Sequence, residues 1–195
     1  MLAHTILAIV TGEPSDSAVL EAALAVAAPE AVEITALYVK ADPQRVIPLL
    51  GDGLSGAMAG EVIAAIERDD ATRATQARAG FDQWSRERKV AIQPAPAAQA
   101  ISGVAAIWRE LTGREDDAAA YLGRNADLLI LARREDMPGM GTVEACLFNS
   151  GRPVLLAPTA PSAKFGSHVG VFWNASCQAA RAVGDAMPLL RNAQR

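Results

Sequence analysis

The sequence predicts an α/β protein with an open, doubly wound parallel sheet of five strands. Short apolar runs bounded by turn residues alternate along the chain with longer amphipathic segments. The runs are continuously apolar, which is typical of strands that are covered on both faces. Strands that alternate with helices in this way indicate parallel strands joined by helical crossovers.

The first strand–helix–strand unit occupies the N-terminal part of the chain. Residues 5–11 form the first apolar run, and a Gly-Glu-Pro-Ser turn ends it. Ser15 or Asp16 can cap the helix that follows, which we expect over 16–28. Residues 32–39 are the second strand, so the unit implies a right-handed crossover.

A long helix and two irregular segments come next. Residues 40–58 are rich in glycine and proline, and we expect a loop there that could serve as a flap. Residues 59–89 predict one long helix with an apolar side. Its other side has mixed charge and is expected to face water, with Arg68, Asp69, Asp70, Arg73 and Arg78. Residues 90–103 are rich in Ala, Pro and Gln and predict a surface excursion, in which 90–93 is a candidate edge strand.

Three further strands and two helices complete the predicted sheet. The strands are expected at 105–111, 127–132 and 153–157. The helices between them are expected at 114–125 and 139–150.

Composition excludes several classes of protein. The net charge is −4 with no long basic block, so a nucleic-acid footprint is missing. Two cysteines without a Cys-x-x-Cys pair argue against a disulfide framework or a zinc site. No basic segment precedes the first apolar run, and no run reaches the ~18 residues of a membrane-spanning helix. We therefore expect a cytoplasmic protein.

The C-terminal part of the chain echoes the first strand and helix. Residues 6–12 are matched by 169–175, and an Ala-rich amphipathic helix at about 177–190 follows the second copy. A repeat at this spacing predicts tandem copies of one fold. One strand and one helix cannot bury a core alone, so they must dock on the first domain, swap into a neighbour, or belong to a longer original chain.

This internal repeat sets the predicted domain boundaries. We expect one domain over 1–159, a proline-containing linker over 160–166, and a partial second repeat of one strand and one helix over 167–195. The apolar residues of the strand expected at 169–175, in the partial repeat, should pack against another chain or against the edge of the first domain.

Four segments share a pattern that is typical of one family. They are residues 6–12, Ala36-Leu37-Tyr38-Val39, Ala126-Asp127-Leu128-Leu129-Ile130-Leu131, and Ser150-Gly151-Arg152-Pro153-Val154-Leu155-Leu156. With them the chain resembles the universal stress protein (UspA-like) family over about 4–158, and the start of a second copy over 167–193. The run Trp108-Arg109-Glu110-Leu111-Thr112-Gly113 is further similar to a bacterial branch of this family that often carries two domains.

The resemblance implies a particular sheet and a mode of assembly. The sheet would be adenine nucleotide alpha hydrolase-like, that is Rossmann-like, with strand order 3-2-1-4-5. The protein would form a homodimer through the last strand, and the C-terminal tail is the other candidate interface.

Many members of this family bind ATP, and the resemblance implies where a nucleotide would lie. Adenine would lie near the ends of the first two strands, and the phosphates in a loop of pattern Gly-x-x-Gly, nine residues, then Gly-Ser/Thr. Glycines in such a loop let backbone amides approach the phosphate, and a helix N-terminus adds a favourable dipole. The candidate cofactor-binding residues are Thr11, Gly12, Val39, Ala132, Arg133, Gly139, Gly141, Thr142 and Val143.

The chain departs from this pattern. Ala132 and Glu135 stand where the family has the first two glycines, and the loop up to Gly141 is four residues shorter. Glu135 and Asp136 add two negative charges near the expected phosphate, which could each cost on the order of 1 kcal/mol or more. In family members that bind ATP, an acidic residue ends the first strand. In this chain Thr11 stands at that position.

Two interpretations of the turn remain open. Gly139-x-Gly141-Thr142 can form an anion nest at a helix N-terminus, or a tight turn with Thr142 as the cap, which we favour. Arg133 and Arg134 can contact a phosphate, or pair with the two acidic residues that follow them.

The sequence contains no recognisable catalytic or metal-binding constellation. His4 and His168 have no carboxylate or cysteine at ligand spacing, and the serines lack a Gly-x-Ser-x-Gly setting. Cys146 lies on the apolar side of a helix and is predicted to be a small core residue. We expect a protein that is not an enzyme.

Three functional hypotheses follow. The first is a non-enzymatic, dimeric stress-response or regulatory module with a degraded nucleotide site and no bound cofactor, no nucleic-acid partner and no membrane partner. The alternative is an ATP-binding switch with slow or no hydrolysis. In the third, the loop 40–58 and the turn 132–142 enclose a small apolar or cationic ligand.

Overall fold

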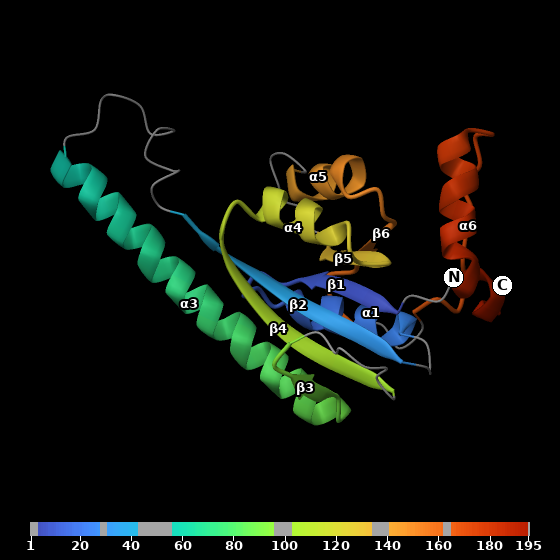
Figure 1. Cartoon of the computed structure of the whole chain (residues 1–195), viewed down its shortest axis with the longest axis horizontal. Helices are drawn as coiled ribbons and strands as arrows, with labels where there is room; N and C mark the ends of the chain where they lie inside the picture. The colour runs from blue at the N-terminus through green and yellow to red at the C-terminus, as the bar shows by residue number, and fades with distance from the viewer. Residues whose placement is uncertain are drawn as a thin grey trace.

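The protein has the predicted α/β fold (Figure 1). The structure is a computed structural model, and it describes residues 4–27, 31–42, 56–95, 103–133, 141–161 and 165–194. Among the described residues, no helix is both long and apolar enough to cross a membrane.

The sheet is parallel throughout and has the order β3-β4-β2-β1-β5-β6. Its strands are β1 (Thr5–Ile9), β2 (Val32–Ala41), β3 (Ala91–Gln93), β4 (Val104–Gly113), β5 (Leu128–Ala132) and β6 (Val154–Ala157). Without β3, the strands lie in the order β4-β2-β1-β5-β6. Numbered along the chain as five strands, this is the expected order 3-2-1-4-5.

The predicted count of five strands is wrong, because β3 adds a sixth strand at the edge beside β4. This strand has only three residues and is largely exposed. An exposed edge strand carries little of the apolar pattern by which buried strands are recognised.

Helices cover both faces of the sheet. On one face lie α1 (Asp16–Val26) and α3 (Gly56–Arg88), and on the other lie α4 (Glu115–Gly123) and α5 (Gly141–Asn149) (Figure 1). A last helix, α6 (Cys177–Asn192), stands at the side of the molecule (Figure 1). The helices at 16–28, 59–89, 114–125 and 139–150 are thus confirmed, with ends that differ by a few residues.

Two hydrophobic clusters hold these layers together, one on each face of the sheet. Ile6, Ala8 and Val10 of the first strand point into the cluster under α1 and α3. Leu7 and Ile9 point into the cluster under α4 and α5. Because successive side chains of a strand point to opposite faces, a strand buried on both sides must be apolar at every position, which is the pattern seen in the sequence.

An aromatic group anchors α3 to the sheet. Phe81 is fully buried, and its ring lies 5.5 Å from that of Trp108 on β4 and 6.0 Å from that of Trp84. These centroid distances fall in the range of favourable aromatic pairs. The two tryptophans therefore serve as packing anchors.

A polar contact joins α3 to the end of β2. The hydroxyl of Tyr38 donates to the backbone oxygen of Asp70 at 3.1 Å and to its Oδ1 at 3.0 Å, and the amide of Ala41 donates to the same Oδ1 at 3.2 Å. Asp70 is buried, so the expectation that it faces water is wrong. Burial, followed by the hydrogen bond to Asp70, raises the pKa of Tyr38.

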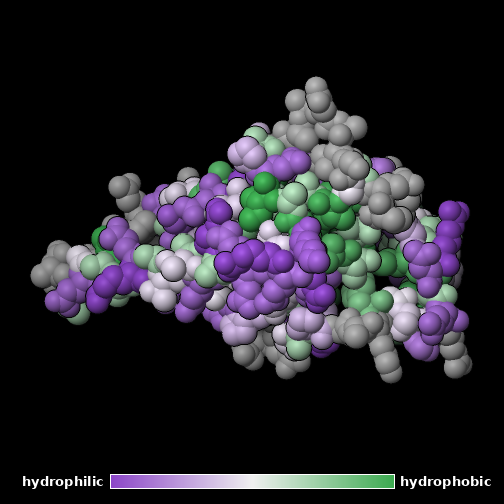
Figure 2. All heavy atoms as spheres, turned by 90° about the horizontal axis from the view of Figure 1, so that it is seen from below, coloured by the Kyte–Doolittle hydropathy of each residue, from purple (hydrophilic) through white to green (hydrophobic). Residues whose placement is uncertain are grey.

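The N-terminal part of α3 projects beyond the sheet. The helix has 33 residues, which corresponds to about 50 Å. Figure 2 shows the projecting end as an arm at the left, with mostly hydrophilic and pale residues, while hydrophobic residues gather between the centre of this face and α6 at the right. Most of the loop expected at 40–58 lies outside the described residues.

The predicted strand of the C-terminal repeat is absent from the described structure. Residues 169–175 have no strand pairing, and the expected helix is present as α6. Phe172 is 99% exposed, and Val171 and Trp173 are at least half exposed. A strand requires a partner edge for its backbone amides and carbonyls, and none of the described strands pairs with this segment. Packing of these side chains on the domain's own edge is therefore not found, and packing against another chain stays a prediction.

Truncation of Phe81 should cost much of the stability of the fold. We expect Phe81→Ala to lower the free energy of unfolding by about 3–5 kcal/mol, because it removes a fully buried ring and leaves a cavity. Phe172→Ala is the matched control, and it should change stability by less than about 0.5 kcal/mol because that ring is exposed. Urea denaturation measures both, and equal effects of the two substitutions would contradict the assignment of the core.

Candidate functional site

The structure brings most of the predicted nucleotide residues to one edge of the sheet. Thr11 and Gly12 follow β1, Arg133 follows β5, and α5 begins at Gly141. The carboxyl ends of parallel strands meet at the same edge, which is where open α/β sheets bind ligands. Gly139, together with the acidic pair at 135–136 and Arg134, lies outside the described residues.

A carboxylate of the chain itself occupies the hydrogen-bond donors that follow β1. The amide of Thr11 donates to Oδ1 of Asp16 at 2.9 Å, and the amide of Gly12 donates to Oδ2 at 2.8 Å. The hydroxyl of Thr11 adds a third contact at 3.3 Å. Asp16 is 7% exposed, so both of these backbone amides are already satisfied inside the protein.

Gly12 is also closed off by the backbone of α3. Its φ of +84° favours glycine, and a Cβ placed there would lie 2.4 Å from the backbone oxygen of Arg73. A side chain at this position would therefore clash with main-chain atoms, and the same contact leaves no room for a ligand on that side of Gly12.

A second internal carboxylate meets the start of α5. The hydroxyl of Thr142 donates to Oε1 of Glu115, the first residue of α4, at 2.8 Å. Gly141 next to it is exposed, and a Cβ built there would meet no atom of the described residues within 4 Å. The backbone at this helix start is thus accessible, whereas its hydroxyl is engaged.

The electrostatic environment of this helix start is acidic. The first turn of α4 carries Glu115, Asp116 and Asp117, and Arg114 neutralises part of that charge by pairing with Asp116. The Arg114 guanidinium lowers the pKa of Asp116. Burial, with smaller contributions from Glu115 and Asp116, raises the pKa of the Cys146 thiol to about 11. The thiol therefore stays protonated at neutral pH and is a poor nucleophile.

The remaining predicted residues have structural contacts. Val39 and Val143 both pack against the hydrophobic cluster under α4 and α5. The amide of Arg133 donates to the backbone oxygen of Ala157 at 2.7 Å, which continues the pairing of β5 with β6 beyond Ala132. These positions shape the crevice, and their contact with a ligand stays a prediction.

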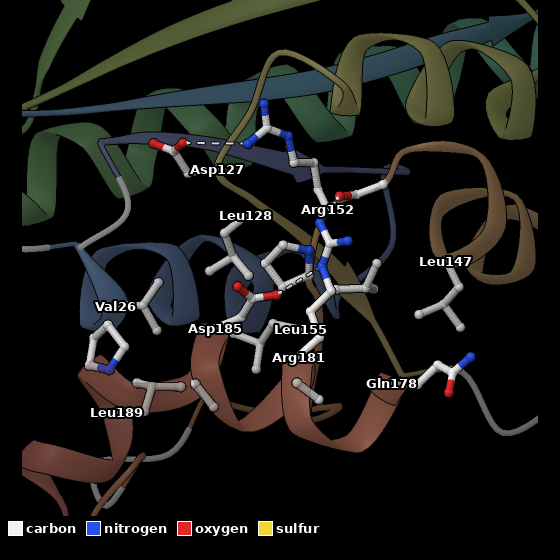
Figure 3. A pocket seen from close by; sticks show the side chains of 16 residues that line it. Val26, Asp127, Leu128, Leu147, Arg152, Leu155, Gln178, Arg181, Asp185 and Leu189 are labelled. Carbon is white, nitrogen blue, oxygen red and sulfur yellow. Dashed lines mark hydrogen bonds and ion pairs between the residues drawn. The ribbon is translucent and has the colours of Figure 1, made fainter. Parts of the chain in front are cut away.

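A separate pocket lies between α6 and the body of the domain. Its volume is about 450 Å³, and its wall is mainly aliphatic, with Leu128, Leu155 and Leu189 among the lining residues (Figure 3). Two weak ion pairs lie among its lining residues, Arg152 with Asp127 at 3.9 Å and Arg181 with Asp185 at 4.0 Å (Figure 3). Across the described parts of the chain, no group of three or more His, Cys, Asp or Glu residues could hold a metal ion.

Sequence reasoning missed the two carboxylates that dominate this site. The sequence predicts Ser15 or Asp16 as the helix cap. The cap position is Ser15, and the Asp16 side chain reaches back to the end of β1. Its short separation from Thr11 could have signalled this contact. Glu115 is 27 residues from Thr142, and no local pattern connects residues so far apart.

The burial of Asp16 predicts a pH dependence of stability. Burial outweighs the hydrogen bonds and raises the pKa of Asp16 above 3.8. The folded protein then holds a proton where the unfolded chain has lost it, so Asp16 stabilises the fold at low pH and this contribution disappears as the pH rises through the folded pKa. We expect the stability of the wild type relative to Asp16→Asn to fall as the pH rises from about 4 through the raised pKa of the folded state, measured by urea denaturation. A relative stability that rises with pH would contradict the assigned direction.

The fold of this chain is similar to those of several solved structures. The chain is similar to the hypothetical protein MJ0577, whose structure was a test case for assigning biochemical function, with a TM-score of 0.53 and 14% identity over 83% of this chain and 100% of that one. It is also similar to the universal stress protein UspA from Lactobacillus plantarum, with a TM-score of 0.49 and 17% identity over 78% and 96%. A universal stress protein in complex with cAMP matches with a TM-score of 0.40 and 17% identity over 82% and 100%.

By sequence, no protein-family model and no curated protein matches this chain. At identities this low the likeness concerns the fold alone. Together with the strand order, the likeness to MJ0577 shows that this chain has an open, Rossmann-like α/β fold.

Proposed function

We propose that this protein is a non-enzymatic regulatory module of universal stress type whose nucleotide site no longer holds a polyphosphate. The observation that carries the proposal is the hydrogen bond from Thr142 to Glu115 at 2.8 Å. In the pattern that the sequence resembles, this hydroxyl would face a phosphate. Here a carboxylate of the same chain takes its place.

The physics of charge supports this proposal. A phosphate that displaced Glu115 from Thr142 would leave two anions close together. Two unit charges 4 Å apart repel by about 1 kcal/mol in water and by about 4 kcal/mol near a protein surface. Asp116 and Asp117 in the same helical turn add to the negative potential. No compensating cation approaches Glu115 within 4 Å among the described residues.

The end of β1 supports the same proposal independently. The amides of Thr11 and Gly12 are already bound by Asp16, and Gly12 touches the backbone of α3. Adenine recognition at this position would require the protein to give up those bonds. The protein's own carboxylates therefore substitute for ligand groups at two points of the crevice.

The alternative is an ATP-binding switch, and one observation favours it. Within the described part of the chain, no atom lies within 4 Å of a Cβ built on the exposed Gly141, so a ligand could approach the amides at the N-terminus of α5. Helix N-termini bind anions through such amides. A test with ATP distinguishes the two functions.

Dimerisation is part of the proposal. β6 is the last strand of the sheet and has a partner on one side only, among the described residues. Leu156 on β6 is 43% exposed, and Leu147 and Phe148 on α5 are 49% and 82% exposed. An edge strand beside exposed apolar side chains is a natural site for a second chain. The C-terminal tail is the other candidate interface.

The domain organisation and the location of the protein also belong to the proposal. A first domain over 1–159, a linker over 160–166 and a partial repeat over 167–195 accommodate the structure, since the sheet ends at β6 and α6 follows as a separate helix. We propose a cytoplasmic protein, with neither a nucleic acid nor a membrane as its partner.

ATP should not stabilise this protein. We expect no thermal shift of the wild type with millimolar ATP, in the presence or absence of magnesium, because Glu115 holds Thr142. For comparison, a ligand at a hundredfold excess over its dissociation constant adds about 2.7 kcal/mol of stability, or roughly 5–10 °C in a chain of this size. Differential scanning fluorimetry measures the shift.

The variant Glu115→Gln tests whether the charge of Glu115 is what prevents ATP binding. Removal of this negative charge should increase whatever ATP affinity remains, whereas Glu144→Gln, an exposed residue elsewhere in the first turns of α5, should have a smaller effect. A clear shift of the wild type by ATP would establish the switch and overturn the proposal.

The dimer should depend on Phe148. We expect the wild type to be a dimer at micromolar concentration, and Phe148→Asp to weaken association by roughly thirty-fold, the effect of losing an interface anchor worth about 2 kcal/mol. Ile92→Asp is the control, because Ile92 is also an exposed apolar residue, at 43% against 82% for Phe148, but lies on β3 at the opposite edge of the sheet. Light scattering after size exclusion measures the mass, and a monomeric wild type would contradict the dimer.

A further inference from the structure

The pocket between α6 and the body of the domain lies at the amino ends of β5 and β6. Asp127 directly precedes β5, Leu128 begins it, and Pro153 directly precedes β6. The other wall of the pocket is α6 (Figure 3). The nucleotide crevice lies at the carboxyl ends of the same strands, so a ligand in this pocket would not compete with one in the crevice.

The helix α6 covers this part of the domain without closing the space beneath it. None of the residues of α6 is buried. Five aliphatic side chains in the pocket wall stay half-buried, namely Val26, Leu128, Val154, Leu155 and Leu189. A volume of about 450 Å³ remains, which is the size of many small-molecule sites. A mainly apolar molecule would be stabilised there, because it would remove both its own surface and these side chains from water.

Small side chains keep the space open on the side of α6. Ala182 and Ala186 lie one turn apart on the helix, and both line the pocket. The positions of α6 that line the pocket recur every three or four residues, so they belong to one face of the helix. A large side chain at position 186 would therefore take up part of the space that a ligand needs.

A polar pair stands at the mouth of the pocket. The Nε of Arg181 lies 4.0 Å from Oδ2 of Asp185, which is too far for a hydrogen bond. Both side chains rise from α6 toward the domain beside Leu155 (Figure 3). They are 74% and 39% exposed, so a ligand can reach them. A primary carboxamide has an acceptor oxygen beside a donor N–H, and it can bond to both members of such a pair at once.

The charges of the pocket wall balance. The two cations are Arg152 and Arg181, and the two anions are Asp127 and Asp185. Neither a carboxylate nor an ammonium head group would find an uncompensated charge of the opposite sign. Removing an ionic group from water without such a partner costs far more than removing a neutral polar group. The pocket therefore favours a neutral head group on an apolar body.

We propose that this pocket binds a small aliphatic primary carboxamide. The aliphatic chain lies against Leu128, Leu155 and Leu189. The carbonyl oxygen accepts a hydrogen bond from Arg181, and the amide N–H donates one to Asp185. The ligand touches both α6 and the domain, so it holds the helix in place. The site is independent of the nucleotide crevice, whether or not that crevice binds ATP.

Isothermal titration calorimetry with octanamide tests this proposal. We expect saturable binding to the wild type at millimolar or lower concentration. Hexanamide should bind about fifteen-fold more weakly, because each of the two missing methylenes contributes about four-fold when buried. Octanoate and octylamine carry a charge at neutral pH, and each should bind weaker than octanamide by about ten-fold or more.

Two matched variants of α6 locate the site. Ala186→Phe should weaken octanamide binding by about ten-fold or more, because the ring fills part of the pocket and excludes the ligand's methylenes. Ala180→Phe adds the same ring at an exposed position of α6 outside the pocket wall, and it should leave the affinity unchanged. Hydrogen exchange gives a second measurement: octanamide should slow the exchange of α6 amides and leave those of α4 unchanged.

Two charge variants test the head group. Asp185→Asn leaves the wall with one net positive charge, so octanoate should gain about five-fold relative to octanamide, the effect of one exposed ion pair. Arg181→Gln leaves one net negative charge, and octylamine should gain in the same way. The proposal is overturned by a wild type without saturable heat at millimolar octanamide, by equal affinity of Ala186→Phe and Ala180→Phe, or by octanoate binding as tightly as octanamide to the wild type.

Discussion

The junction at Gly12 and Asp16 is the constraint on which the rest of this structure depends. The Asp16 carboxylate accepts the amides of the two residues that leave β1, and it does so from the first turn of α1. Gly12 in turn lies against the backbone of α3 at Arg73. Asp16 thereby ties α1 to the end of β1, and Gly12 lets α3 pack closely against the same point. A buried carboxylate whose hydrogen bonds are satisfied can hold this geometry.

The same junction changes what the carboxyl edge of the sheet can recognise. Backbone amides at the end of a strand or the start of a helix attract anions only while they are available. Here Asp16 uses the first set, and Glu115 engages the hydroxyl of Thr142 at the start of α5. At these two points the edge of the sheet is internally bonded by the chain's own carboxylates.

Much of the fold could be predicted from local patterns, and the failures have a common origin. The sequence predicts β1 and β5 because each is buried on both faces and apolar at nearly every position. β3 was only a candidate because it is short and exposed, and the strand expected at 169–175 lacks a partner edge in the described structure. Asp70 was assigned to water because a charged stripe on a helix is usually solvated, yet Tyr38 and Ala41 bury it.

The sequence by itself determined that strands and helices alternate in a parallel sheet, because this follows from periodicity and from the right-handed connection of parallel strands. The strand order and the edge at which a ligand would bind were implied by the resemblance to a known family. Only the tertiary structure decided the chemistry at that edge. Thr142 and Glu115 are 27 residues apart, and Gly12 and Arg73 are separated by a strand and a helix. Whether a hydrogen-bond donor faces solvent or an internal carboxylate depends on the packing of elements that are far apart in the sequence. No local pattern in the chain shows which of these elements come into contact.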